Sequence, residues 1–193
     1  MRAVNTMAIG VAGLSAMIAI AAHGRLSTVP SSDASKSEAV DDAEGNLHVP
    51  AAYRTAYQYL GSWAIAADQG QGSKELHVVY GSPGAIDAYR TDGHFPNDTV
   101  LVKEVYEAAT AQLTTGTVSR ADALKGWFVM KKDNNGRHLG NKLWGDGWGW
   151  SWFDADKPLK TTSTDYHLDC QGCHVPAQST DWIYVNGYPV LRR

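Results

Sequence analysis

The chain has 193 residues, of which 44% are hydrophobic and 19% are charged, a balance that allows a globular domain with a buried core. Its formal net charge is −3, so it lacks the basic excess of proteins whose main partner is nucleic acid. Seven tryptophans and nine tyrosines in so short a chain predict an aromatic core or an aromatic-lined pocket.

Residues 1–24 have the pattern of an export signal. Arg2 gives a positive start, residues 7–22 are apolar or small throughout, and the small residues at the end of this run suit a signal peptidase. The run is shorter than the roughly 20 residues that a membrane span needs, which favours a cleaved signal over a retained membrane anchor. We therefore expect an exported, periplasmic protein.

Residues 25–46 have a different composition, rich in serine and acidic residues and without an aromatic residue. Such a stretch cannot bury enough apolar surface to offset its chain entropy. We therefore expect a flexible polar linker over residues 25–46 and a folded domain over residues 47–193.

Two helices are expected in the first half of this domain. One begins at Pro50, which suits the first turn of a helix, and the other begins near Ser82 and ends at Gly93. At helical spacing the first would carry one face made of Tyr53, Tyr57 and Leu60.

Strands are expected at residues 76–80, 99–107, 127–132 and 148–152. In the last of these, three tryptophans alternate with small residues, so their indoles share one face of the strand. Several short strands with a few short helices predict an α+β domain built mainly on an antiparallel sheet.

The chain contains only two cysteines, in the sequence Cys170-Gln171-Gly172-Cys173-His174, which has the C-x-x-C-H pattern of covalent haem attachment. One turn of chain places the two sulfurs beneath the two vinyl groups of a porphyrin, and the next residue projects its imidazole onto the iron. We therefore predict one haem c, bonded through Cys170 and Cys173, with His174 as an axial iron ligand.

Three other interpretations of this motif are weaker. A redox C-x-x-C pair normally follows a strand early in a thioredoxin-like domain, whereas this pair lies near the C-terminus. A structural zinc site needs four ligands, and only three candidate ligands are clustered here. A structural disulfide suits an exported protein but leaves the adjacent histidine unexplained.

Further segments, in order along the chain, resemble the cytochrome P-460 family. They are VPAAYR (49–54), YGSPGA (80–85), FPNDTVLVKE (95–104), LWGDGWGW (143–150), DCQGCH (169–174), DW (181–182) and GYPVL (187–191). The resemblance implies a mostly antiparallel β domain, often a homodimer, with a penta-coordinate haem. The characterised enzymes of the family oxidise hydroxylamine to nitrogen oxides and pass electrons to a periplasmic acceptor. A related branch, the β-type cytochromes c-prime, shares the fold and binds small gases.

In the oxidising members a lysine is also bonded to the porphyrin edge, and Lys103 stands at the matching position. Strand alternation independently places Leu101, Lys103 and Val105 on one face, and Val102 and Glu104 on the other. A lysine between apolar neighbours loses hydration, which favours the neutral, nucleophilic amine that such a bond requires. The alternative is an edge-strand lysine that reaches water or pairs with a carboxylate.

The expected distal pocket departs from the oxidising members at Phe128, which stands where they carry a proton-relaying glutamate. Phenylalanine cannot take a proton, but it can line the distal side of the iron with an apolar face, as in the gas-binding branch. Alternatively, Phe128 is an ordinary core residue of its strand. His77 falls where the oxidising members carry a polar distal residue, and is a candidate to move protons or a surface imidazole. Met130 is either a candidate sixth ligand or ordinary core packing, and Arg54 is either a candidate partner of a haem propionate or a surface residue of its helix.

The sequence therefore leads to two main functions. The first is a periplasmic mono-haem c oxidoreductase that acts on hydroxylamine or a related small nitrogen species and uses a periplasmic electron acceptor. The second is a cytochrome that binds nitric oxide or another gas without turnover. Lys103 favours the first and Phe128 the second. A simple electron carrier is a third option if Met130 reaches the iron.

Overall fold

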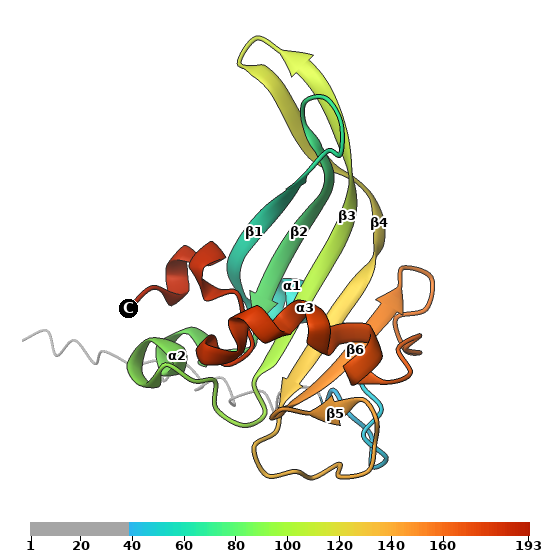
Figure 1. The fold of residues 1–193 in the computed structure, drawn as a ribbon, viewed down its shortest axis with the longest axis vertical. Coiled ribbons are helices and arrows are strands. Elements are labelled where there is room, and N and C mark those ends of the chain that lie inside the picture. The colour runs from blue at the N-terminus through green and yellow to red at the C-terminus, as the bar shows by residue number, and fades with distance from the viewer. Residues whose placement is uncertain (1–38) are drawn as a thin grey trace, which may run out of the picture. The chain divides into compact units, whose positions relative to one another are not determined.

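One antiparallel sheet organises the described part of the chain, residues 39–193 of the computed structural model (Figure 1). Its strand order is β1-β2-β3-β4-β6-β5. The strands are β1 (Gln58–Ala66), β2 (Ser73–Gly81), β3 (Val100–Leu113), β4 (Gly116–Lys132), β5 (Trp144–Gly145) and β6 (Trp148–Asp154). The expected fold class, α+β with a mainly antiparallel sheet, is confirmed. The predicted signal peptide and the predicted linker as far as residue 38 lie outside the described residues.

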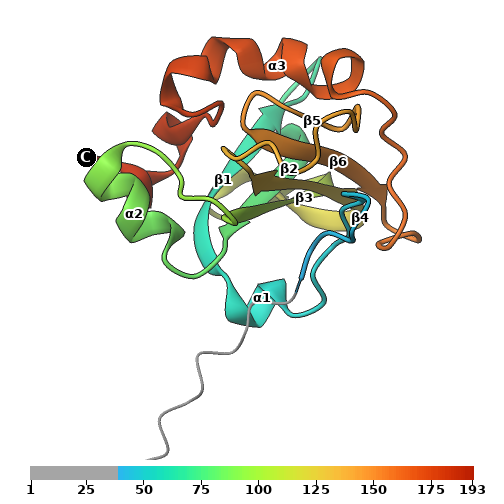
Figure 2. The ribbon, with the colours of Figure 1, turned by 90° about the horizontal axis from the view of Figure 1, so that it is seen from below.

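Short helices lie on both faces of the sheet. Figure 2 shows the C-terminal segment over one face and α1 below the other. The helices before the C-terminal segment are α1 (Tyr53–Ala56) and α2 (Ala85–Asp92), and α2 is followed, as expected, by Gly93, which has a left-handed φ of 79°. The C-terminal segment begins with consecutive helical residues, namely His167–Gln171 (π), α3 (Gly172–His174) and a 3-10 helix at Val175–Thr180, and continues with 3-10 turns at Val185–Gly187 and Pro189–Leu191.

The first helix is shorter than the sequence predicts. It ends at Ala56, because Tyr57 adopts an extended backbone with ψ of 158°. Leu60 therefore lies in β1, where it is buried beside an exposed Tyr59. The apolar spacing that resembles a helical face belongs partly to a strand, in which neighbouring side chains point to opposite sides.

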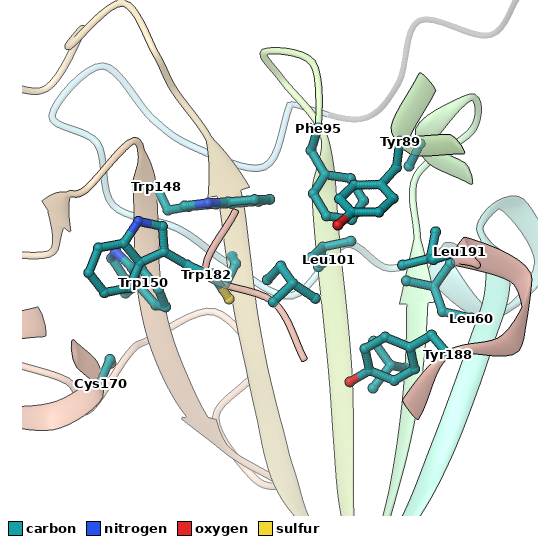
Figure 3. Close-up of a cluster of buried hydrophobic side chains, with 14 of the residues drawn as sticks. Leu60, Tyr89, Phe95, Leu101, Trp148, Trp150, Cys170, Trp182, Tyr188 and Leu191 are labelled. Atoms are coloured by element: carbon teal, nitrogen blue, oxygen red, sulfur yellow. The ribbon is translucent and has the colours of Figure 1, made fainter. Parts of the chain in front are cut away.

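Two hydrophobic cores pack against the two faces of the sheet. The first lies under the C-terminal segment, and Figure 3 shows the indoles of Trp148, Trp150 and Trp182 gathered on one side of it. The second lies on the opposite face and includes Val102 and Val129, both with no exposed surface. The expected alternation of β6 is confirmed, since Trp148 and Trp150 are buried in the first core.

The folded domain begins earlier than the expected boundary at residue 47. Val40 is buried in the second core, and Asp41 forms a β-bridge with Leu47. The carboxylate of Asp41 also pairs with Lys131 of β4 and accepts a hydrogen bond from His138 at 3.1 Å. Residues 40–46 are thus part of the fold rather than of a flexible linker. Within residues 39–193, no helix has both the length and the apolar character needed to cross a membrane.

Candidate haem site

A cavity of about 640 Å³ lies between one face of the sheet and the C-terminal segment. This volume falls within the roughly 300–1,000 Å³ that is usual for small-molecule and cofactor pockets. Seven of the eight residues that the sequence nominates for the site line it: Cys170, Cys173, His174, Lys103, Phe128, His77 and Met130. The sheet and the C-terminal segment therefore bring together residues that are up to 97 positions apart in the sequence.

The two cysteines lie on the C-terminal wall of the cavity. Cys170 is buried, Cys173 is exposed, and the two thiols are not joined to each other. Burial raises the pKa of Cys170 to about 11, so this thiol is protonated at neutral pH. The segment is held from outside by Gln171, whose Nε2 donates to Asp146 at 2.7 Å. Asp146 lies between two glycines and has a left-handed φ of 55°, a turn conformation that aspartate tolerates.

The imidazole of His174 is oriented for a ligand. Its Nδ1 lies 2.7 Å from the carbonyl oxygen of Trp182. Because a carbonyl only accepts hydrogen bonds, Nδ1 carries the hydrogen and Nε2 keeps its lone pair. Burial lowers the pKa of His174, which favours this neutral form. A second hydrogen bond that fixes tautomer and ring orientation is typical of metal-ligating histidines.

Lys103 lies in a row of side chains across the sheet, paired in register with Val79 on one side and Phe128 on the other. Its Nζ lies 4.3 Å from the centroid of the Phe128 ring. Part of its surface remains accessible, but this surface faces the cavity, and burial by protein lowers its pKa. No ion pair of this amine occurs within residues 39–193, so the alternative of a lysine paired with a carboxylate is not what the structure shows.

His77 lines the same cavity from β2, where its register partner on β3 is Val105, two residues beyond Lys103. Its Nε2 is 3.1 Å from Glu75 Oε2, and Glu75 Oε1 is 2.5 Å from the amine of Lys125. Burial lowers the pKa of His77, in spite of the carboxylate beside it. The side chain of His77 is 15% exposed, so it is not the surface imidazole that was the alternative.

The other two candidates take different places. Met130 lines the cavity and packs in the first core, in register with Trp150 of β6. Arg54 lies on the opposite side of the sheet, where its Nε donates to Glu104 at 2.6 Å. Glu104 is buried on that side of the sheet, where Tyr53 also donates to it. Arg54 does not line the cavity, so the structure does not support its proposed contact with a propionate.

The weaker interpretations of the cysteine motif find little support in the geometry. The two cysteines do not form a disulfide. Within the described residues, no group of three or more His, Cys, Asp or Glu side chains is arranged to hold a bare metal ion, as a zinc site would require. The sheet is antiparallel, whereas a thioredoxin-like motif belongs with a βαβ pattern.

A comparison with models of known protein families identifies the family of this chain. The model of the cytochrome P-460 family matches residues 50–185. The chain belongs to the cytochrome P-460 family. Membership in this family of cytochromes implies a haem, and the matched range contains both cysteines, His174 and Lys103. No curated protein matches the chain.

The residues present fit the haem that the cytochrome P-460 family implies. The cavity is large enough for a cofactor and mainly apolar in lining, both thiols open onto it, and the His174 ring presents a lone pair. Sequence reasoning missed three supporting groups: the carbonyl of Trp182, the carboxylate of Glu75 and the carboxylate of Asp146. The first contact depends on backbone geometry and the third joins residues 25 positions apart, so no short motif predicts them. Glu75 lies two residues before His77 on the same strand, and this spacing could have indicated their contact.

Proposed function

We propose that the chain is a periplasmic mono-haem c cytochrome that oxidises hydroxylamine or a related small nitrogen species. The observation that carries this proposal is the desolvated amine of Lys103, which has no ion pair within residues 39–193 and shares one cavity with the two thiols and the His174 imidazole. An open haem alone would serve gas binding equally well, whereas a reactive amine at its edge favours the oxidising enzymes.

Haem attachment is proposed to occur through Cys170 and Cys173, each forming a thioether with a vinyl group. His174 would hold the iron through Nε2, since its Nδ1 is committed to the Trp182 carbonyl. When bound, the haem would supply the iron that binds the small substrate and the redox step that removes its electrons. The protein's part is to fix the position of the ring and the orientation of its axial ligand.

Lys103 is proposed to bond to an edge carbon of the porphyrin. The bond requires a neutral amine, and burial lowers the pKa of Lys103 in that direction. The amine loses one hydrogen and the ring carbon another, so the step needs a two-electron oxidant such as a peroxide. Because Lys103 sits in a long paired strand, its side chain projects towards the cavity in a fixed direction.

Export, an external electron acceptor and a homodimer belong to the same proposal. Residues 1–24 have the pattern of a signal peptide, and covalent haem attachment through a C-x-x-C-H motif is compatible with an exported chain. Electrons taken from the substrate need an acceptor, for which we propose a periplasmic redox protein.

The second candidate function is nitric oxide or gas binding without turnover. Phe128 favours it, because an aromatic ring lines the cavity where the oxidising relatives carry a proton-accepting side chain. The ring lies 4.6 Å, centroid to centroid, from Trp152, which makes that wall of the cavity apolar.

The Lys103 bond separates the two candidates. Digestion of the mature, haem-loaded protein should yield one species that joins the Lys103 peptide and the Cys170–His174 peptide through haem. Lys103→Arg should keep the haem through denaturing electrophoresis but show an ordinary c-type spectrum, because arginine cannot easily be deprotonated. The control is Cys170→Ala with Cys173→Ala, which should lose covalent haem altogether. A wild-type Lys103 peptide free of haem would leave gas binding as the function.

A further inference from the structure

A chain of three charged or titratable side chains runs from the cavity to its mouth. His77 contacts Glu75, and Glu75 contacts Lys125 through its other carboxylate oxygen. All three side chains line the cavity. Their exposed fractions rise from 15% for His77 to 25% for Glu75 and 43% for Lys125. The order of contacts is therefore also an order from the inside of the cavity to solvent.

We propose that His77 is the base that takes protons from a ligand bound in the cavity, and that Glu75 is its positioning residue. The proposal rests on the proposed function, because it assigns the proton route of the same site. A carboxylate only accepts hydrogen bonds, so the neutral His77 ring places its hydrogen on Nε2, against Glu75. Nδ1 is then left with the lone pair that receives the proton.

The charge balance of the reaction requires such a group. Each electron that hydroxylamine loses on the way to a nitrogen oxide is accompanied by one proton. The electron goes to the external acceptor, and the proton goes from the substrate N–H or O–H to Nδ1 of His77. The imidazolium formed is stabilised by the carboxylate of Glu75, as in other histidine–carboxylate dyads. It returns its proton to solvent at the mouth of the cavity, which resets the neutral ring.

Other titratable side chains that line the cavity are committed elsewhere. The thiols and His174 face the haem from the C-terminal wall, and Lys103 is assigned to the porphyrin bond. The carboxylate of Asp169 accepts the backbone N–H groups of Thr164 and Asp165, at 2.7 and 3.2 Å. Phe128 cannot accept a proton. Among the side chains that the sheet contributes to the cavity, the imidazole of His77, paired with the carboxylate of Glu75, is therefore the group that carries protons.

The charges around His77 set the pH at which it works. Burial lowers the pKa of His77 most, Glu75 on β2 raises it, and the positive charge of Lys125 on β4 lowers it, as does any charge that Lys103 on β3 carries before its amine is neutral or bonded. On the β1 side its register partner is Trp63, which carries no charge. Across the cavity the C-terminal segment contributes Asp169, Cys170, Cys173, His174, Tyr184 and Tyr188. His77 is therefore neutral, and able to accept a proton, at neutral pH.

Cyanide binding to the ferric, haem-loaded protein tests the base without using turnover. Near neutral pH cyanide arrives as HCN and must lose its proton to bind as the anion. His77→Gln should lower the association rate at pH 7 by about 10²-fold or more, the usual contribution of a general base. The matched control is His94→Gln, which replaces an exposed histidine outside the cavity and should leave the rate unchanged.

Two charge variants at the mouth of the cavity test the pairing of His77 with Glu75. Each should shift the pH dependence of the cyanide association rate, and the two shifts should have opposite directions. The association rate should fall in acid as His77 becomes protonated. Glu75→Gln removes the charge that raises the pKa of His77, so this fall of the association rate in acid, the acid limb of the pH profile, should move to lower pH. Lys125→Gln removes a charge that lowers this pKa, so the limb should move to higher pH. A merely structural role for these side chains would not produce opposite shifts.

The outcomes separate this proposal from the proposed function. If the limbs shift in opposite directions but wild-type protein does not oxidise hydroxylamine, the dyad stands and the enzyme function fails. If wild-type protein oxidises hydroxylamine but His77→Gln matches it in rate and in pH profile, the dyad is overturned. The two mouth variants alter partly exposed side chains, so they decide the matter even if His77→Gln does not fold.

Discussion

The buried ion pair between Lys132 and Asp181 is predicted to stabilise both the domain and the His174 side of the cavity. The two side chains are 5% and 7% exposed, and their charged atoms lie 2.7 Å apart. Asp181 also accepts the backbone N–H of Phe95 at 2.8 Å, and the residue after it supplies the carbonyl that orients His174. The pair therefore ties the end of β4 to the turn that holds the expected iron ligand.

Asp181→Asn is the sharpest perturbation of this pair. Asparagine tolerates the left-handed φ of 59° at this position and keeps an oxygen for Phe95, but it leaves the Lys132 charge buried and unpaired. Breaking a buried pair in this way costs about 3–5 kcal/mol. At roughly 2–4 °C per kcal/mol for a domain of this size, the melting temperature should fall by about 6–20 °C.

Urea unfolding of the haem-loaded protein, followed by circular dichroism, measures this loss. The matched control is Asp122→Asn, which breaks an exposed pair with Arg120 whose side chains are 53% and 71% exposed, and should change stability by no more than about 1 kcal/mol. Adding Lys132→Met to Asp181→Asn should restore part of the stability, because no unpaired charge remains buried. The reasoning is refuted if Asp181→Asn costs no more than the exposed control, or if the second substitution makes the loss larger.

Two further predictions concern the opposite face of the sheet. Glu104→Leu should destabilise the domain by about 1–3 kcal/mol or more in urea unfolding, because the Tyr53 hydroxyl and the Arg54 guanidinium lose their buried acceptor; Glu107→Leu on the exposed part of β3 is its control. Burial raises the pKa of Asp41, but its two basic partners outweigh burial and leave it lowered. Its contribution is therefore present above the unfolded-state pKa of about 3.9 and is lost as pH falls through the lower folded value. The stability difference between wild type and Asp41→Asn should close in acid, and a difference that persists there would contradict this assignment.

The parts of the fold that the sequence predicts correctly are those with strong local patterns. The alternation around Lys103 identifies which side chains of β3 face the cavity, because the register of β3 with both neighbouring strands is regular from Leu101 to Val105. Gly93 marks the end of α2 through its left-handed backbone. The C-x-x-C-H spacing identifies a site because the motif alone nearly determines where two sulfurs and an imidazole lie.

The parts that the sequence misplaces depend on distant contacts. Leu60 has helical spacing from Tyr53, yet it lies in β1, at an irregularity between Tyr59 and Gly61 in the pairing of β1 with β2. The polar composition of residues 40–46 predicts a linker, but Val40 packs in a hydrophobic core and Asp41 forms an ion pair with Lys131. Composition indicates how much apolar surface a segment can bury by itself, but it gives no information about the partners that other strands provide.

The chemistry of Lys103 and the buried cluster around Glu104 depend on each other through the register of β3. Adjacent residues of a strand point to opposite faces, so Lys103 faces the cavity and Glu104 faces Arg54 and Tyr53. A slip of one residue would exchange them, because a change of register by one turns every side chain to the other face. It would bury an unpaired ammonium in the second core and place a carboxylate in the cavity, both costly without partners. The ion pair of Glu104 therefore opposes this slip from the side of the sheet that carries no haem chemistry. In this way a contact remote from the cavity holds the amine where the proposed bond needs it.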